Sequence, residues 1–227
     1  MNYTELKAAI QAYTENTETN FVAEIPVFVT QAEQRIYNSV QFPSIRKNVT
    51  GVTTAGNKYL QCPLDFLAVY SIAVVTDVTG SDINTGTYEY LLNKDVNFIR
   101  QAYPQANDTG VPRYYALFGP RSDNEDELTF ILGPTPDTTY DVELHYYYYP
   151  ESITVAANGQ TWLGDNFDSV LLYGSLVEAY TYMKGEQDMM ALYNGKYQEA
   201  LALAKRLGDG MERQDAYRSG QFRQKVT

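Results

Sequence analysis

The chain is poor in the residues that most often carry chemistry. Its 227 residues include one cysteine, one histidine and one tryptophan. A single cysteine, Cys62, excludes an intrachain disulfide and a cysteine metal cluster, and the lone His145 excludes a multi-histidine metal site. A Cys-His nucleophile would need these two residues together, but each belongs to a different expected strand. We therefore expect no catalytic residue, no metal, no cofactor and no enzyme activity.

Long apolar runs and basic residues are scarce as well. No stretch of about 18 uncharged apolar residues occurs, and no basic-then-apolar leader opens the chain, which predicts a protein made in the cytosol that does not span a membrane. Seventeen Lys and Arg residues face 28 Asp and Glu residues, for a net charge of −11. Such a chain does not grip nucleic acid by counterion release, although it can surround DNA without holding it.

Apolar residues recur at helical spacing near both ends of the chain. One stripe covers residues 4–15, and a second is expected to begin at Pro26. Two more cover 166–183 and 187–207, and Gly208 is expected to end the last helix. Helices therefore flank the middle of the chain.

The middle of the chain has the two-residue period of strands. Residues 51–63 predict a hairpin that turns at 55–57, and residues 66–75 predict a central strand. The remaining expected elements are strands at 87–92, 111–119, 127–133 and 140–149 and a short helix from Val96. No connection is long enough for repeated helical crossovers, so the strands are expected to be antiparallel.

These elements predict an α+β protein. A four-helix bundle is expected from helices in 1–46 and 151–210, with a mainly antiparallel β domain of residues 47–150 inserted between them. Residues 211–227 are expected to form an extended C-terminal tail.

The helix at 166–183 has no polar face, which predicts burial on more than one side. One side would pack within the bundle and the other against a neighbouring copy of the chain. The candidate interface residues on this helix are Leu172, Tyr173, Leu176 and Tyr180.

Four successive tyrosines occur in "DVELHYYYYPES", residues 141–152. In a strand, the even-numbered residues from 142 to 148 would face the core and the odd-numbered ones from 143 to 149 would face outward. The outward set is amphipathic, so Tyr147 and Tyr149 are further interface candidates. The alternative is a platform that binds a carbohydrate or a receptor, although the flanking helices and a tryptophan outside the strands favour it less.

The tail combines aromatic and basic side chains and lacks a continuous apolar stripe. Its expected role is docking to a partner on which it becomes ordered. The candidate partner-binding residues are Arg213, Tyr217, Arg218, Phe222 and Arg223. An ordinary terminus without a partner is the alternative.

The order of segments resembles the head-to-tail adaptor (connector) proteins of short-tailed bacteriophages. The resemblance lies in "YTELKAAIQAYTEN", "IPVFVTQAEQRIYN", "GVPRYYALFG", "LGPTPDTTYDVELHYYYYPESIT" and "TWLGDNFDSVLLYGSLVEAYTYMKGEQDMMALYNGKYQEALA", and it covers most of residues 3–206. It implies a structural protein of the virion neck, made in the host cytoplasm. It also implies a ring, typically of twelve copies, that docks beneath the portal and carries the tail nozzle while DNA passes through its lumen. Acidic residues facing that lumen would repel phosphates and let DNA slide.

Overall fold

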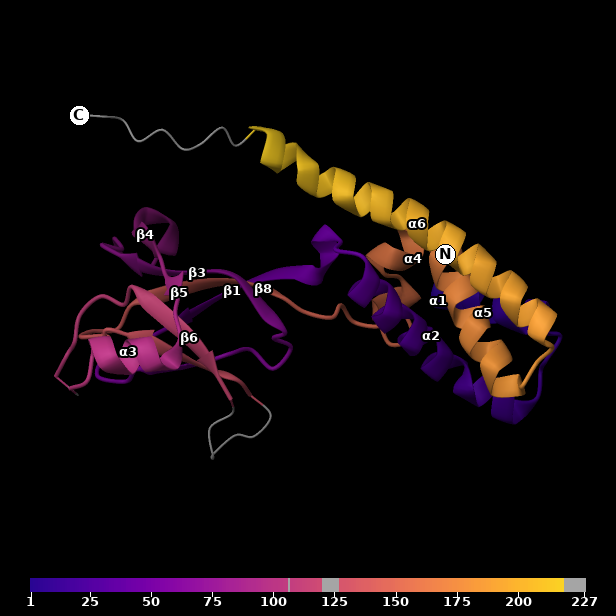
Figure 1. Ribbon diagram of the computed structural model, residues 1–227, viewed down its shortest axis with the longest axis horizontal. Helices are drawn as coiled ribbons and strands as arrows, with labels where there is room; N and C mark the ends of the chain where they lie inside the picture. The colour runs from indigo at the N-terminus through magenta and orange to yellow at the C-terminus, as the bar shows by residue number, and fades with distance from the viewer. Residues whose placement is uncertain (106, 120–126, 219–227) are drawn as a thin grey trace. The chain divides into compact units, whose positions relative to one another are not determined.

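The computed structural model describes residues 1–105, 107–119 and 127–218, with side chains described as far as Gly208. The chain divides into two compact units (Figure 1), and each is described by itself. The helical unit comprises Met1–Ile45 and Tyr149–Thr227, and the β unit comprises Arg46–Tyr148. The fold class is α+β, as predicted.

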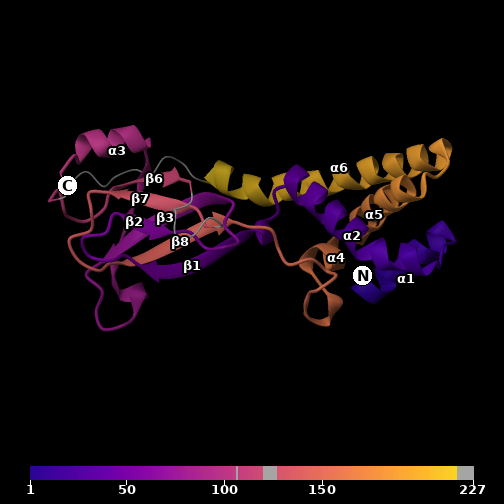
Figure 2. The same ribbon diagram turned by 90° about the horizontal axis from the view of Figure 1, so that it is seen from below.

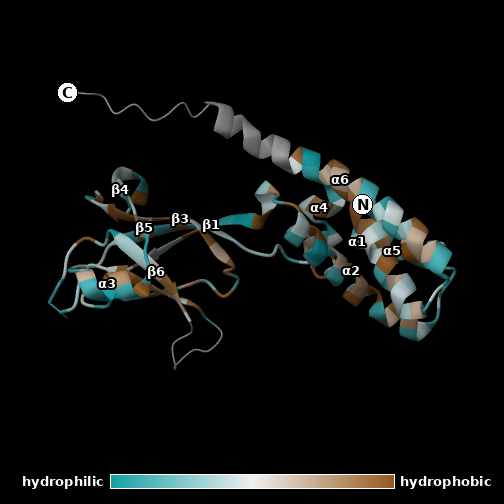
Figure 3. Cartoon of the chain, viewed as in Figure 1, coloured by the Kyte–Doolittle hydropathy of each residue, from teal (hydrophilic) through white to brown (hydrophobic). Residues whose placement is uncertain are grey.

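Four long helices make up most of the helical unit: α1 (Tyr3–Thr14), α2 (Thr19–Ser39), α5 (Asp168–Met183) and α6 (Gln187–Arg218), with a short α4 (Trp162–Asn166) before α5. Helix α5 packs against each of the other long helices. Figure 2 shows α6 running along α5, and Figure 3 shows apolar and polar residues interleaved along the helices. The nearly all-round apolar sequence of α5 is explained by this shared position, since it presents a side to each neighbour.

Helix α2 starts seven residues before the predicted position. Pro26 lies inside it rather than at its first turn, although proline removes one hydrogen bond from a helix interior. Phe21 and Ile25, on the N-terminal side of the proline, are both buried. Packing of these side chains stabilises a helical turn that local propensity disfavours.

Helix α6 also departs from the prediction, because it continues through Gly208 to Arg218. Gly208 is buried, and a Cβ at this position would lie 3.0 Å from Cγ1 of Val40. The glycine permits close packing against the end of α2, and it does not terminate the helix. The predicted tail therefore begins inside a helix; the side chains of Arg213, Tyr217 and Arg218, and the whole of residues 219–227, lie outside the described part.

Gly195 is an exposed glycine within α6. None of the described atoms lies within 4 Å of where its Cβ would be. Because glycine in a helix interior costs about 0.5–1 kcal/mol relative to alanine, Gly195→Ala is expected to stabilise the isolated protein by that amount. A thermal melt should show a Tm higher by roughly 2–4 °C. An unchanged or lowered Tm would mean that Gly195 has a packing partner.

The β unit contains two four-stranded sheets. Sheet A has the order β1-β8-β3-β4 and sheet B the order β2-β7-β6-β5. All described strand pairs are antiparallel except β5 with β6. The elements are β1 (Arg46–Val52), β2 (Tyr59–Gln61), β3 (Ala68–Thr76), β4 (Thr87–Tyr90), β5 (Leu92–Asn93), α3 (Val96–Ala102), β6 (Tyr114–Phe118), β7 (Thr129–Gly133) and β8 (Asp141–Tyr147).

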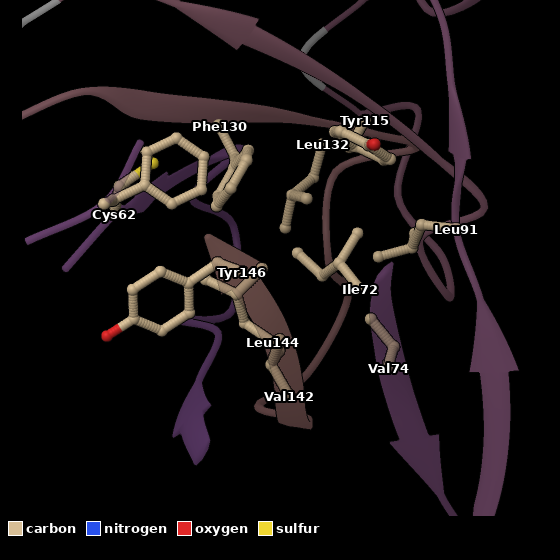
Figure 4. Close-up of a cluster of buried hydrophobic side chains, with 11 residues drawn as sticks. Cys62, Ile72, Val74, Leu91, Tyr115, Phe130, Leu132, Val142, Leu144 and Tyr146 are labelled. Atoms are coloured by element: carbon tan, nitrogen blue, oxygen red, sulfur yellow. The ribbon is translucent and has the colours of Figure 1, made fainter. Parts of the chain in front are cut away.

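The two sheets enclose an apolar core (Figure 4). Side chains from both sheets meet there, among them Ile72, Val74, Phe130, Leu144 and Tyr146. A smaller cluster on sheet B packs around Ile99 of α3. Strand β3 lies inside sheet A, as predicted for a central strand.

The predicted hairpin at 51–63 is wrong, because β1 and β2 belong to different sheets. The connection between them is hydrogen-bonded to the segment before β8: Thr53 N donates to Tyr140 O at 2.9 Å and Gly56 N donates to Pro136 O at 2.8 Å. Each strand of the supposed hairpin therefore takes a partner distant in sequence. Local turn residues could not reveal this choice.

Candidate interaction surface

The tyrosine strand β8 alternates between the core and the outward face of sheet A. Val142, Leu144 and Tyr146 are buried, which confirms the predicted core set. Glu143, His145 and Tyr147 are partly exposed on the other face. This outward face is the main candidate surface of the β unit.

Tyr149 does not share that face with Tyr147. Strand β8 ends at Tyr147, and Tyr149 belongs to the helical unit. Its hydroxyl donates a hydrogen bond of 2.6 Å to Oδ1 of Asn38 at the end of α2. The expectation that both tyrosines extend one strand face is therefore wrong.

Tyr147 instead forms an aromatic and basic cluster with Tyr70 and Arg46. The two rings meet edge to face, with centroids 5.9 Å apart and an interplanar angle of 74°. The Arg46 guanidinium carbon lies 4.8 Å from the Tyr70 centroid and 5.7 Å from that of Tyr147. Cations over aromatic faces are attracted by the ring quadrupole, so this cluster holds a fixed, partly exposed patch.

Tyr70 was missed by sequence reasoning. Strict alternation would place it on the core side together with Ile72. A register shift between Val69 and Ser71 instead marks a bulge at this position, and Tyr70 is 53% exposed. No sequence signal identifies that bulge.

A polar row lies beside the aromatic cluster. Asn48 Nδ2 donates to Glu143 Oε1 at 2.7 Å, and Ser71 Oγ lies 3.3 Å from His145 Nδ1. The third distance, from His145 Nε2 to Glu143 Oε1, is 4.0 Å.

Serine, histidine and glutamate in this order suggest a nucleophilic triad, but the geometry does not form one. A distance of 4.0 Å is too long for a hydrogen bond, and Glu143 Oε1 already accepts a hydrogen bond from Asn48. A working nucleophile needs a base oriented directly by its third partner. The row therefore provides polar groups for an interface, not a catalytic centre.

Asp65 fixes the edge of this surface from the core side. It pairs with Lys47 at 2.7 Å and accepts a hydrogen bond of 2.8 Å from the Tyr146 hydroxyl. Burial raises the pKa of the Asp65 carboxyl, but the hydrogen bonds from Lys47 and Tyr146 outweigh it, so the pKa lies below its usual value. The buried tyrosine is thereby satisfied.

The four candidates on α5 do not act alike. Leu172 and Leu176 are only 8% and 0% exposed within the subunit, so neither has side-chain surface to offer a neighbour. Tyr173 and Tyr180 are partly exposed and pack on Tyr193 of α6, with centroid distances of 6.5 and 4.9 Å. Only these two tyrosines remain candidates for a contact between copies.

Cys62 is not a reactive thiol. It is buried, and burial together with the charge of Glu127 raises its pKa to about 12. The nucleophile is the thiolate, so the residue is inert near neutral pH. Within the described ranges, no group of three potential ligand side chains could hold a metal ion, and no helix is long and apolar enough for a bilayer.

These features define a class: a structural protein with aromatic and polar interaction surfaces and, in the described part of the chain, no assembled catalytic centre. The family model of the SU10 adaptor proteins matches residues 1–224. The chain belongs to the SU10 adaptor protein family, and the predicted resemblance to phage head-to-tail adaptors is confirmed. Its role is that of a structural adaptor in the virion neck. Among curated proteins, none matches the chain.

Proposed function

We propose that the chain forms a ring, of twelve copies, between the portal and the tail nozzle, with DNA passing through its lumen. The observation that carries this proposal is the family match across residues 1–224. In this proposal α1, α2, α5 and α6 form a four-helix bundle in each subunit, and the β unit is inserted into it. The surplus of 28 acidic over 17 basic residues supports a lumen that repels DNA.

The test is the mass of the purified protein, measured alone and with purified portal. We expect a single ring-sized species in at least one of these mixtures. A protein that stays monomeric in both would overturn the ring.

The carbohydrate-binding alternative receives less support from the surface. Sugar faces stack on exposed ring faces, whereas Arg46 lies over Tyr70 and Tyr147, and those two rings meet at 74°. A glycan array is expected to show no binding.

Residues 211–227 are proposed to dock on the portal. They hold four basic and two acidic side chains, in contrast to the acidic remainder, and two aromatics, which favour binding to an acidic surface. Truncation after Gly210 is expected to weaken portal binding at least tenfold and to leave Tm within about 2 °C, because no continuous apolar stripe is removed. Binding by titration calorimetry and a thermal melt check both. A second truncation that keeps residues through Arg218 separates Tyr217 from Phe222; full-strength binding after both truncations would show that another part docks.

A further inference from the structure

Sheet A ends in two strands that are each paired on one side only. Strand β1 pairs with β8 and β4 pairs with β3, and sheet A includes no further strand beyond either. Six of the seven residues of β1 are exposed, and the strand contains no proline. Unpaired edges of this kind are templates for addition of another strand.

The hydrogen-bond register shows which backbone groups of β1 face outward. Thr53 N donates to Tyr140 O, and bonded and non-bonded residues alternate along an antiparallel pair. Lys47, Val49 and Gly51 therefore bond to β8, and the N–H and C=O groups of Asn48, Thr50 and Val52 point away from it.

The same argument applies to the opposite edge. Leu91 N donates to Ile72 O, so Glu89 faces β3 and the backbone groups of Tyr88 and Tyr90 point outward. Tyr90 is 63% exposed. Both edges therefore present free rows of donors and acceptors by the alternation of the ladder.

The two edges are complementary in direction. Because four strands alternate along sheet A, β1 and β4 run opposite to each other. When one copy is placed beside another without reversing the sheet, β1 of the first lies antiparallel to β4 of the second. The sheet pattern then continues without interruption.

The two edges are also complementary in charge. Residues 46–53 hold two basic side chains and no acidic one, whereas residues 77–95, around β4, hold four acidic side chains and one basic one. A β1–β1 contact would bring like charges together, and a β1–β4 contact brings opposite charges together. It would also cover Tyr90 with Val52, which is 57% exposed on the same face of the sheet.

We propose that sheet A continues from copy to copy, with β1 of one subunit paired to β4 of the next. The contact is heterologous, and such contacts close into rings. The inference rests on the proposed ring and specifies which strands join its subunits. Each copy would add four strands, or about 19 Å, to the circumference at a spacing of about 4.8 Å.

Thr50→Pro tests the β1 edge. Proline removes an outward N–H and is tolerated on edge strands, so the β8 ladder should persist. Thr50→Ala is the matched control because it keeps the N–H. We expect Thr50→Pro to weaken assembly at least tenfold relative to Thr50→Ala, measured by mass photometry under the conditions in which the wild type assembles, with far-UV circular dichroism confirming that the variant is folded.

Tyr90→Pro tests the β4 edge, with Tyr90→Ala as its control. Alone, each proline variant should fail to form rings. Mixed in equal amounts, they should form dimers and nothing larger, because intact β4 of one variant can pair only with intact β1 of the other. Normal assembly of Tyr90→Pro would overturn the β1–β4 contact and favour a β1–β1 one.

The outcomes separate this inference from the ring itself. A wild type that never assembles, alone or with portal, overturns both. A wild type that assembles while folded Thr50→Pro assembles equally well overturns the strand contact and leaves the ring standing.

Discussion

Leu176→Asp is expected to unfold the helical unit. Leu176 is fully buried on α5, the helix against which α1, α2 and α6 all pack. The substitution removes apolar burial and places a carboxylate where no partner is available, at a combined cost of more than about 4 kcal/mol. Far-UV circular dichroism should show a large loss of helical signal or a Tm lowered by at least about 10 °C.

Tyr180→Asp provides the comparison on the same helix. Tyr180 is half-buried, and its hydroxyl lies 3.4 Å from the Tyr13 carbonyl oxygen to which it donates. A carboxylate there can reach water, so Tyr180→Asp is expected to cost less than half as much stability as Leu176→Asp. Equal melting of wild type and Leu176→Asp would show that the core of the helical unit is not centred on α5.

Glu33→Ala is expected to destabilise the protein by about 2–4 kcal/mol. Glu33 is a buried carboxyl on α2 that accepts a hydrogen bond of 2.9 Å from the backbone N–H of Ile153. Alanine would leave that buried N–H unsatisfied and create a cavity. Glu33→Gln keeps an acceptor of the same size, so its Tm should stay within about 3 °C of the wild type; equal stability of the alanine variant would mean that water replaces the lost acceptor.

The same residue predicts a pH dependence. Burial raises the pKa of Glu33, and the Ile153 and Ser152 hydrogen bonds oppose that rise only partly. A carboxyl with a raised pKa binds its proton more tightly in the folded state, so its contribution to the free energy of unfolding increases as the pH falls through the folded pKa towards the usual value of 4.5. Stability of the wild type relative to Glu33→Gln should therefore rise on acidification, and urea unfolding from pH 7 to pH 5 measures it; a fall would show that the folded pKa is lowered.

The sequence predicted those elements whose pattern is local. The alternation in β8, the central strand β3 and the short helix α3 all follow from periodicity over a few residues. The predictions that failed depended on contacts distant in sequence. Pro26 and Gly208 were assigned as helix ends from local preference, and burial of neighbouring side chains decided otherwise.

The candidate surface shows the same division. Tyr147 was found from its place in an alternating strand, but its partners Arg46 and Tyr70 come from two other strands. Glu33 gave no signal, because a glutamate within a helical stripe is normally a solvated residue. Its position became meaningful only when Ile153, 120 residues away, was placed beside it.

The route of the chain through the β unit has a consequence for how the protein can be rearranged. The unit begins with β1 and ends with β8, and these are adjacent strands in which Arg46 faces Tyr147. The two ends of the insertion are therefore about 4.5–5.5 Å apart, a gap that a short glycine-containing linker spans. The whole β unit is thus a cassette: it can be excised, or exchanged for one of different surface, through a single narrow junction. Recombination between related genomes needs to preserve only that junction to give an old helical scaffold a new binding face.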